Sequence, residues 1–392
     1  MHITSTRVSR SHIIYTIAAI GFIYVLHSAI PIYSNSSFLQ LFANEWTVGL
    51  IYMVGSAFSI LGFIIAPTMI RRFGNYKTAI FLVCLQIFLM YGLISSISPY
   101  AIALFFALQM AVISLIGLTI DIFLEVYTDA SSVGAVRGFH TAVLNASWVL
   151  APLIGSLLLN GTNNYHSTYV AALAMLFPLL YLIYRNFPRF KDPNYTHLSP
   201  WQLIKHISSN TDWTKLFAAN VILQTFYSWM VIYSPIYLNK TIGFGWAEIG
   251  IIFVVMLIPF PLIQYPLGLL ADRKYGEKEM LAIGFAIMGI TTMFLSLVTV
   301  SSVVLWASLL LLTRIGAASA EIMMEVYFFK TVPTRDSSVL GSFRITRPVS
   351  YFLAPLIMMI GLLFTTDQYM FVVIGAMCLV GLIPALTIKD TR

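Results

Sequence analysis

The sequence predicts an all-α polytopic membrane protein with about twelve transmembrane helices, arranged as two six-helix halves related by pseudo-twofold symmetry. Its composition, its repeated apolar runs and an internal repeat carry this prediction. Of the 392 residues, 59% are apolar and only 9% are charged, whereas soluble domains carry about 25% charged residues. A surface with so few charges must face lipid, so the bilayer is an expected partner.

Apolar runs of membrane-spanning length recur along the whole chain. At a rise of 1.5 Å per residue, about 20 residues cross the roughly 30 Å of hydrocarbon. The first run follows Arg7 and Arg10 and lacks a small-residue cleavage site, so we interpret it as a span and not as a signal peptide. The expected spans are 12–33, 46–70, 78–97, 99–128, 137–159, 165–184, 213–239, 246–271, 279–299, 301–329, 338–363 and 368–387.

The basic residues follow the alternation of loops that these spans create. Of the 22 Lys and Arg residues, 18 lie at the termini or in every second loop, and the outer loops hold only Lys240. Positive residues concentrate in cytoplasmic loops. We therefore expect a multi-pass protein of the plasma or inner membrane with both termini in the cytoplasm. The scattering of basic residues over short loops argues against nucleic acid as a partner.

Two short motifs recur in matching spans of the two halves. Glu125-Val-Tyr is repeated at Glu325-Val-Tyr, and Ala151-Pro-Leu-Ile is repeated at Ala354-Pro-Leu-Ile. Two repeats in register indicate a duplication of six spans. We expect an N-terminal bundle over 1–184, a cytoplasmic linker over 185–212 and a C-terminal bundle over 213–392.

At the loop between spans 8 and 9, the segment from Gly268 to Lys278 contains Asp272-Arg273 and Gly276. It closely resembles the loop signature of the major facilitator superfamily, and the likeness extends over nearly the whole chain. The first-half counterpart, from Gly62 to Gly74, is degraded. Ala151-Pro-Leu-Ile-Gly-Ser is loosely similar to the span 5 signature of the family's antiporters.

The resemblance implies a charge network at the cytoplasmic mouth that holds the two halves together and breaks when the mouth opens. The alternative is that these charges only solvate loop ends and fix orientation. The candidate gate residues are Arg71, Arg72, Glu125, Arg137, Asp272, Arg273, Glu325 and Arg335.

Ionisable residues within the spans are the candidates for a substrate or proton pathway, because a charge in hydrocarbon costs about 2.5–3.5 kcal/mol unless a partner or water stabilises it. Glu321 and Arg347 lie at matching depths of about 12 and 14 Å, which predicts an ion pair. Burial favours the protonated carboxyl, so Asp121 and Glu321 are candidate proton carriers. The alternative is that these residues are structural. The pathway candidates are His27, Asp121, Gln224, Arg314, Glu321 and Arg347.

The resemblance implies a secondary transporter of a small solute that works by alternating access. We expect proton coupling, favour export, and expect a monomer. Proton-coupled uptake or facilitated diffusion of a polar or anionic solute is the alternative, because three arginines occupy spans 10 and 11. A non-transporting receptor on the same scaffold is an alternative of another class. The sequence contains no phosphate-binding Gly-rich loop, catalytic constellation or metal-ligand cluster, so we expect neither an enzyme nor a cofactor or metal.

Overall fold

The computed structural model contains helices joined by short connections, and no strand occurs among the residues that it describes. These are residues 10–128, 133–160, 164–193, 202, 205, 207–270, 276–331 and 337–389. In the first part of the chain the helices are α1 (Arg10–Ala29), α2 (Asn35–Leu39), α3 (Glu45–Phe73), α4 (Asn75–Ser95), α5 (Pro99–Tyr127), α6 (Val133–Leu159) and α7 (Tyr165–Asn186). The later elements are α9 (Thr211–Ile236), the π-helix η1 (Tyr237–Thr241), α10 (Trp246–Leu257), α11 (Pro259–Leu270), α12 (Glu277–Leu295), α13 (Val303–Thr331), α14 (Ser337–Gly361), the 3₁₀-helix η3 (Asp367–Tyr369), α15 (Met370–Val380) and α16 (Leu382–Thr387).

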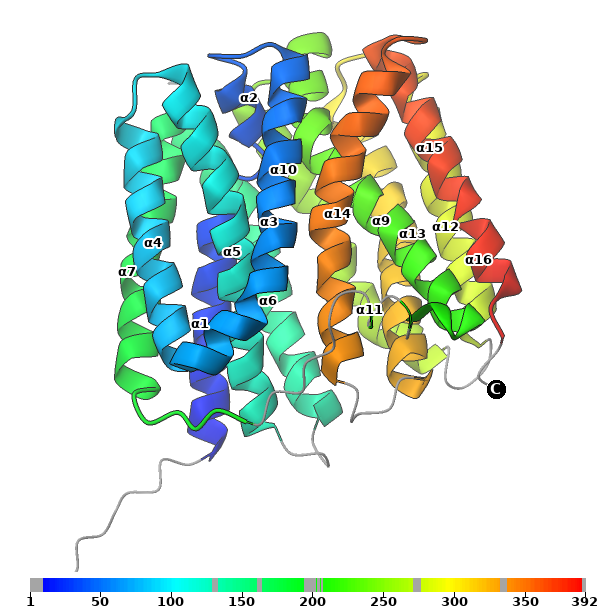
Figure 1. The fold of residues 1–392 in the computed structure, drawn as a ribbon. Coiled ribbons are helices and arrows are strands. Elements are labelled where there is room, and N and C mark those ends of the chain that lie inside the picture. The colour runs from blue at the N-terminus through cyan, green and yellow to red at the C-terminus, as the bar shows by residue number, and fades with distance from the viewer. Residues whose placement is uncertain are drawn as a thin grey trace, which may run out of the picture.

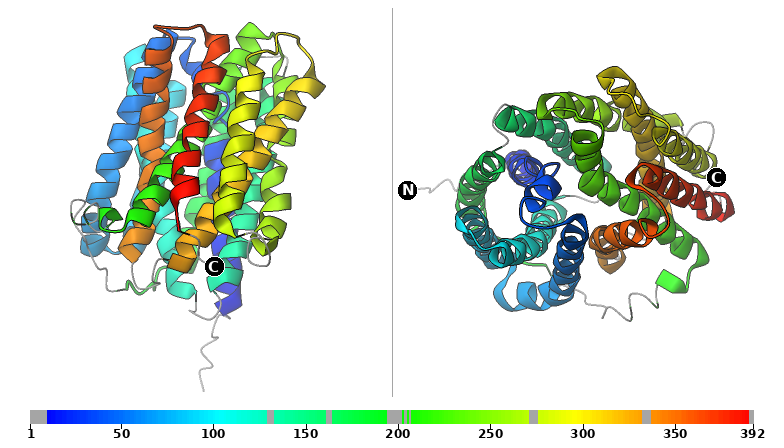
Figure 2. Two further views of the ribbon diagram at one scale, coloured as in Figure 1. Left: turned by 90° about the vertical axis from the view of Figure 1, so that its right-hand side faces the viewer. Right: turned by 90° about the horizontal axis from the view of Figure 1, so that it is seen from above.

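In this described part, eleven helical stretches are long and apolar enough to cross a membrane. The exception among the expected spans is α14, whose mean hydropathy is lowered by Arg344 and Arg347, although the helix runs beside α3 through the bundle (Figure 1). Eleven of the twelve expected spans therefore have a matching stretch, and the all-helical membrane fold is confirmed. Both ends of the described chain lie at one face of the bundle, which we call the terminal face (Figures 1 and 2).

The helices pack as two groups with a limited set of contacts between them. Helices α1 and α3–α7 pack on one another, and so do α9–α16. The most extensive contacts between the groups are made by α14 with α3, by α10 and α11 with α6, and by α9 with α2. Figure 2 shows the groups side by side when the molecule is seen along its long axis. The division into bundles with a linker at 185–212 stays a prediction.

Prolines account for the main differences between the expected and observed helix boundaries. The first helix ends at Ala29, four residues earlier than expected, and Pro31 follows it. The expected span 246–271 is divided into α10 and α11 at Ile258, directly before Pro259. Proline has no backbone N–H and disfavours a helical residue before it. The short helix α2 was not expected.

Helices α12 and α13 touch through their backbones. A Cβ atom added to Gly316 of α13 would lie 2.6 Å from the carbonyl oxygen of Gly284 of α12, and a Cβ on Gly284 would lie 2.8 Å from the carbonyl oxygen of Gly316. Small residues at such a crossing permit this close approach, which maximises van der Waals contact within a membrane. The two helices are therefore tightly joined on the side of α13 that faces α12.

Candidate functional site: a cavity between the two helix groups

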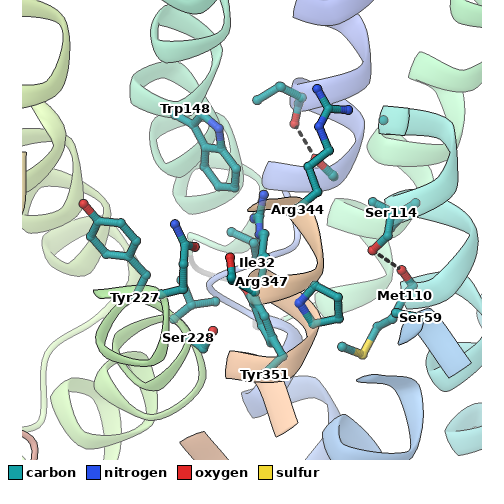
Figure 3. Close-up of a pocket in the computed structure, with 18 of the residues that line it drawn as sticks. Ile32, Ser59, Met110, Ser114, Trp148, Tyr227, Ser228, Arg344, Arg347 and Tyr351 are labelled. Carbon is teal, nitrogen blue, oxygen red and sulfur yellow. Dashed lines mark hydrogen bonds between the residues drawn. The ribbon is translucent and has the colours of Figure 1, made fainter. Parts of the chain in front are cut away.

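A cavity of about 530 Å³ lies between the two groups of helices. Its walls come from α1, α3, α5 and α6 on one side and from α9, α11, α13 and α14 on the other. Figure 3 shows side chains from several of these helices directed into the space. The volume is in the range of small-molecule sites. Of the expected pathway residues, all except one line it: Asp121, Gln224, Arg314, Glu321 and Arg347.

Arg314 places a buried cation at the wall of the cavity. Its side chain comes from α13 and is only 2% exposed. The guanidinium carbon lies 5.1 Å from the ring centre of Phe226 and 5.2 Å from that of Tyr227, and Nε has no hydrogen-bond partner. Among the described residues, no carboxylate forms an ion pair with Arg314. The two aromatic faces stabilise the cation in part and leave its hydrogen-bonding capacity largely unused.

The ion pair expected between Glu321 and Arg347 is not formed, so that prediction was wrong. The Glu321 carboxylate accepts a hydrogen bond of 3.0 Å from the amide of Gln264 on α11. The Arg347 guanidinium instead lies over the indole of Trp148 on α6, at 5.4 Å from the ring centre. Matched depth did not make these two residues partners, because their side chains turn to different neighbours around the same cavity.

The ion pair that does form joins the two groups of helices. Arg344 of α14 pairs with Asp121 of α5, and both side chains line the cavity. The side chains are 33% and 32% exposed, respectively. At 1.5 Å per residue, the pair lies roughly 10 Å from the helix ends at the terminal face. Sequence reasoning placed Arg344 within a span but missed its role, although its depth matched that of Asp121.

His27 does not line the cavity, and its expected place in the pathway stays a prediction. The side chain is 1% exposed and lies among α1, α4 and α7. Its Nδ1–H donates to the carbonyl oxygen of Ala172 (2.8 Å), so Nε2 accepts from the amide of Gln86 (3.1 Å). Gln86 also donates to Gln109, a cavity residue, at 3.4 Å. A neutral imidazole with both nitrogens satisfied acts as a link between helices.

Aromatic contacts join the two groups of helices on the side of the cavity away from the terminal face. Tyr33, which lines the cavity and follows α1, packs on Phe253 of α10 with ring centres 4.5 Å apart. Tyr165 of α7 packs edge-on against Trp246 of α10 at 5.8 Å. These contacts pack α10 of the second group against residues of the first group.

The expected gate residues are only partly described. Asp272, Arg273 and Arg335 lie outside the described residues. Arg71 and Arg72 lie in the last turn of α3, and Arg72 stacks on Phe73. The remaining candidate gate residues lie on helices that line the cavity: Glu125 on α5, Arg137 on α6 and Glu325 on α13. Of these three, Glu325 is a lining residue of the cavity. An ion pair that was not expected, Lys330 with Glu277 at 2.5 Å, ties α13 to α12 at the terminal face.

A bundle of apolar helices with a cavity between two packed groups is the arrangement expected of a membrane transporter. Residues 216–392 match the family described as Major Facilitator Superfamily. The match covers the second half of the chain and, together with the fold, supports a major facilitator superfamily protein, a family of membrane transporters that are not enzymes. A search of curated proteins gives no match.

Proposed function

We propose that this transporter moves a small organic anion through the central cavity by alternating access, coupled to protons. One observation carries the choice of substrate class. Arg314 and Arg347 both line the cavity, and neither forms an ion pair with a described residue. Arg314 is buried, and a buried guanidinium without a carboxylate partner is costly in a membrane. An anionic substrate would supply the missing partner in a bidentate contact.

The walls around the two arginines indicate what the rest of the substrate contacts. The Arg347 guanidinium lies over the ring of Trp148, and the Arg314 guanidinium lies over the ring of Tyr227. Phe260 and Tyr351 line the same cavity. Such walls favour an anion that also has an apolar or aromatic body. We therefore expect aromatic carboxylates to bind better than small inorganic anions.

Glu321 is the group that we propose carries the coupled proton. Its carboxylate lines the cavity and is held by the Gln264 amide, and no described cation forms an ion pair with it. Protonation removes a negative charge from the cavity that contains Arg314 and Arg347. Because that charge repels an anionic substrate, proton and substrate occupancy become linked.

The direction proposed is export, on the resemblance of Ala151–Ser156 to the antiporter signature. This segment of α6 lies at a close helix crossing, since a Cβ on Gly155 would lie 2.8 Å from the carbonyl oxygen of Ile30. It also faces the other group, where Ser156 of α6 contacts Gly250 of α10. The segment is therefore positioned to respond when α6 moves against α10.

Flux in proteoliposomes tests the proposal. We expect a pH gradient to drive uptake or release of an aromatic carboxylate such as benzoate, and not of benzylamine. Replacing Arg347 by Gln should weaken apparent affinity for the anion at least tenfold, since a charged hydrogen bond contributes about 1.5–3 kcal/mol. Arg185→Gln is the matched control, because Arg185 stacks on Tyr181 at the exposed surface of α7. Equal transport of amines and carboxylates would contradict the assignment.

A further inference from the structure

A second pocket lies on the face opposite the terminal face, and the central cavity does not share any of its lining residues. Its volume is about 350 Å³. One wall comes from the segment between α2 and α3, with Gln40 and Glu45, and the other from α9, η1 and η3 of the second group. Figure 1 shows α2 and the beginning of α3 at the end of the bundle away from the C-terminus. The pocket therefore bridges the two groups of helices.

Groups of both charges face this pocket. Glu45 and Asp367 supply two carboxylates from opposite walls, and Lys240 of η1 supplies an ammonium. In the part of the chain that the structure describes, none of the three forms an ion pair. Unpaired acids and a base around one space match a ligand that carries both a positive and a negative group.

Two lining residues each have a buried polar atom without a hydrogen-bond partner. One of these atoms is a donor and the other is an acceptor. The indole N–H of Trp229 is a donor without an acceptor, although the side chain is only 1% exposed. The amide oxygen of Gln40 is a buried acceptor without a donor. Buried polar groups are nearly always satisfied. A ligand with an ammonium donor and a carboxylate acceptor would satisfy both.

Aromatic side chains complete the recognition surface. Trp229 and Tyr233 line the pocket with ring centres 5.9 Å apart, and Tyr237 lies one turn further along. Aromatic faces attract ammonium groups and pack on aromatic rings. Together with the charges, they favour a zwitterion with an aromatic or apolar side chain.

We propose that this pocket is a regulatory site for a small aromatic zwitterion of the amino-acid class. The ammonium binds between Glu45 and Asp367, and the carboxylate binds Lys240 and the indole N–H of Trp229. Because the two walls belong to helix groups that separate at this face during alternating access, an occupant stabilises the closed arrangement. This consequence rests on the proposed function. Binding of the zwitterion to this pocket does not depend on the proposed function.

Binding to the purified full-length protein tests the site without any transport assay. Isothermal titration calorimetry compares phenylalanine, phenethylamine and 3-phenylpropionate, which share the ring and differ in charge. We expect phenylalanine to bind at least tenfold more tightly than either analogue. Glu45→Gln and Lys240→Gln should each weaken its binding about tenfold, and Trp229→Phe should weaken it several-fold. Glu248→Gln is the control at the same face, because Glu248 only caps α10 through the N–H of Gly245.

Arg347→Gln separates this site from the central cavity. Phenylalanine affinity that is unchanged in that variant and reduced in the Glu45 and Lys240 variants supports the pocket. Affinity lost in Arg347→Gln, equal affinity for the three probes, or no binding at all would overturn it. In proteoliposomes, phenylalanine added at this face should slow benzoate flux, and Glu45→Gln should abolish the inhibition. Undiminished flux at saturating phenylalanine would overturn the regulatory role, while the assignment of the pocket as a binding site would stand.

Discussion

The Asp121–Arg344 ion pair should restrain separation of the two helix groups near the terminal face. It joins α5 to α14 directly across the cavity. In Asp121→Asn, the arginine keeps its charge and loses its partner. Any motion that moves α5 away from α14 must break the pair in the wild-type protein and need not do so in the variant.

The exposure of the two side chains sets the size of the effect. Removing one partner of a fully buried pair costs about 3–5 kcal/mol, whereas an exposed pair contributes only about 0.2–1 kcal/mol. With side chains 33% and 32% exposed, solvent screens part of the interaction. We therefore expect a shift of about 1–2 kcal/mol between the closed and separated arrangements, which is a change of about 5- to 30-fold in their ratio.

Chemical labelling of a cysteine in the cavity measures this ratio. Ser114 of α5 lines the cavity (Figure 3), and Ser114→Cys in a background without the exposed Cys84 provides the probe. Labelling from the terminal face should be about 5 to 30 times faster in Asp121→Asn, in line with the shift estimated above.

The charge-swapped double variant provides the control. Asp121→Arg with Arg344→Asp restores the pair in reverse and should return the labelling rate toward that of the wild type, which isolates the pairwise contribution. Normal folding with an unchanged rate in Asp121→Asn, or a swap that rescues nothing, would show that the pair does not hold the groups together.

Further changes give four more expected outcomes. Glu321→Gln should still exchange substrate but lose accumulation driven by a pH gradient, and wild-type accumulation would remove Glu321 from coupling. Gly316→Ala should lower stability by about 1–3 kcal/mol through overpacking and lower the thermal unfolding temperature, whereas Gly138→Ala, with open space around it, should not. His27→Ala should reduce thermal stability while substrate affinity stays unchanged, because His27 links α1, α4 and α7 away from the cavity. Cysteines in 185–212 should react with reagents only from the cytoplasmic side, and labelling from outside would contradict the expected topology.

The sequence predicted the membrane helices well because their signal is local. Runs of apolar residues, interrupted by charged turns, specify where a helix crosses hydrocarbon, whatever its neighbours are. The errors arose where a residue breaks the local pattern, as Pro259 does between α10 and α11. Boundaries moved by a few residues, and the order of crossings was unaffected.

The partners of the buried charges could not be predicted in the same way. Depth along a helix follows from the rise per residue, and matched depth led to the expectation that Glu321 pairs with Arg347. Which helix faces which across the cavity depends on packing between distant segments. Depth alone was compatible with both Glu321–Arg347 and Asp121–Arg344, and only the second pair is formed.

The backbone contact between Gly284 and Gly316 has a mechanical consequence for the cavity. Gly316 lies two residues after Arg314, so the two positions point about 200° apart around α13. One side of that helix is fixed to α12 by direct main-chain packing, while the other carries the buried guanidinium between Phe226 and Tyr227. A helix anchored along its back cannot slide or rotate without moving its neighbour. The position of Arg314 is therefore fixed relative to α12, and its charge moves only when the two helices move together.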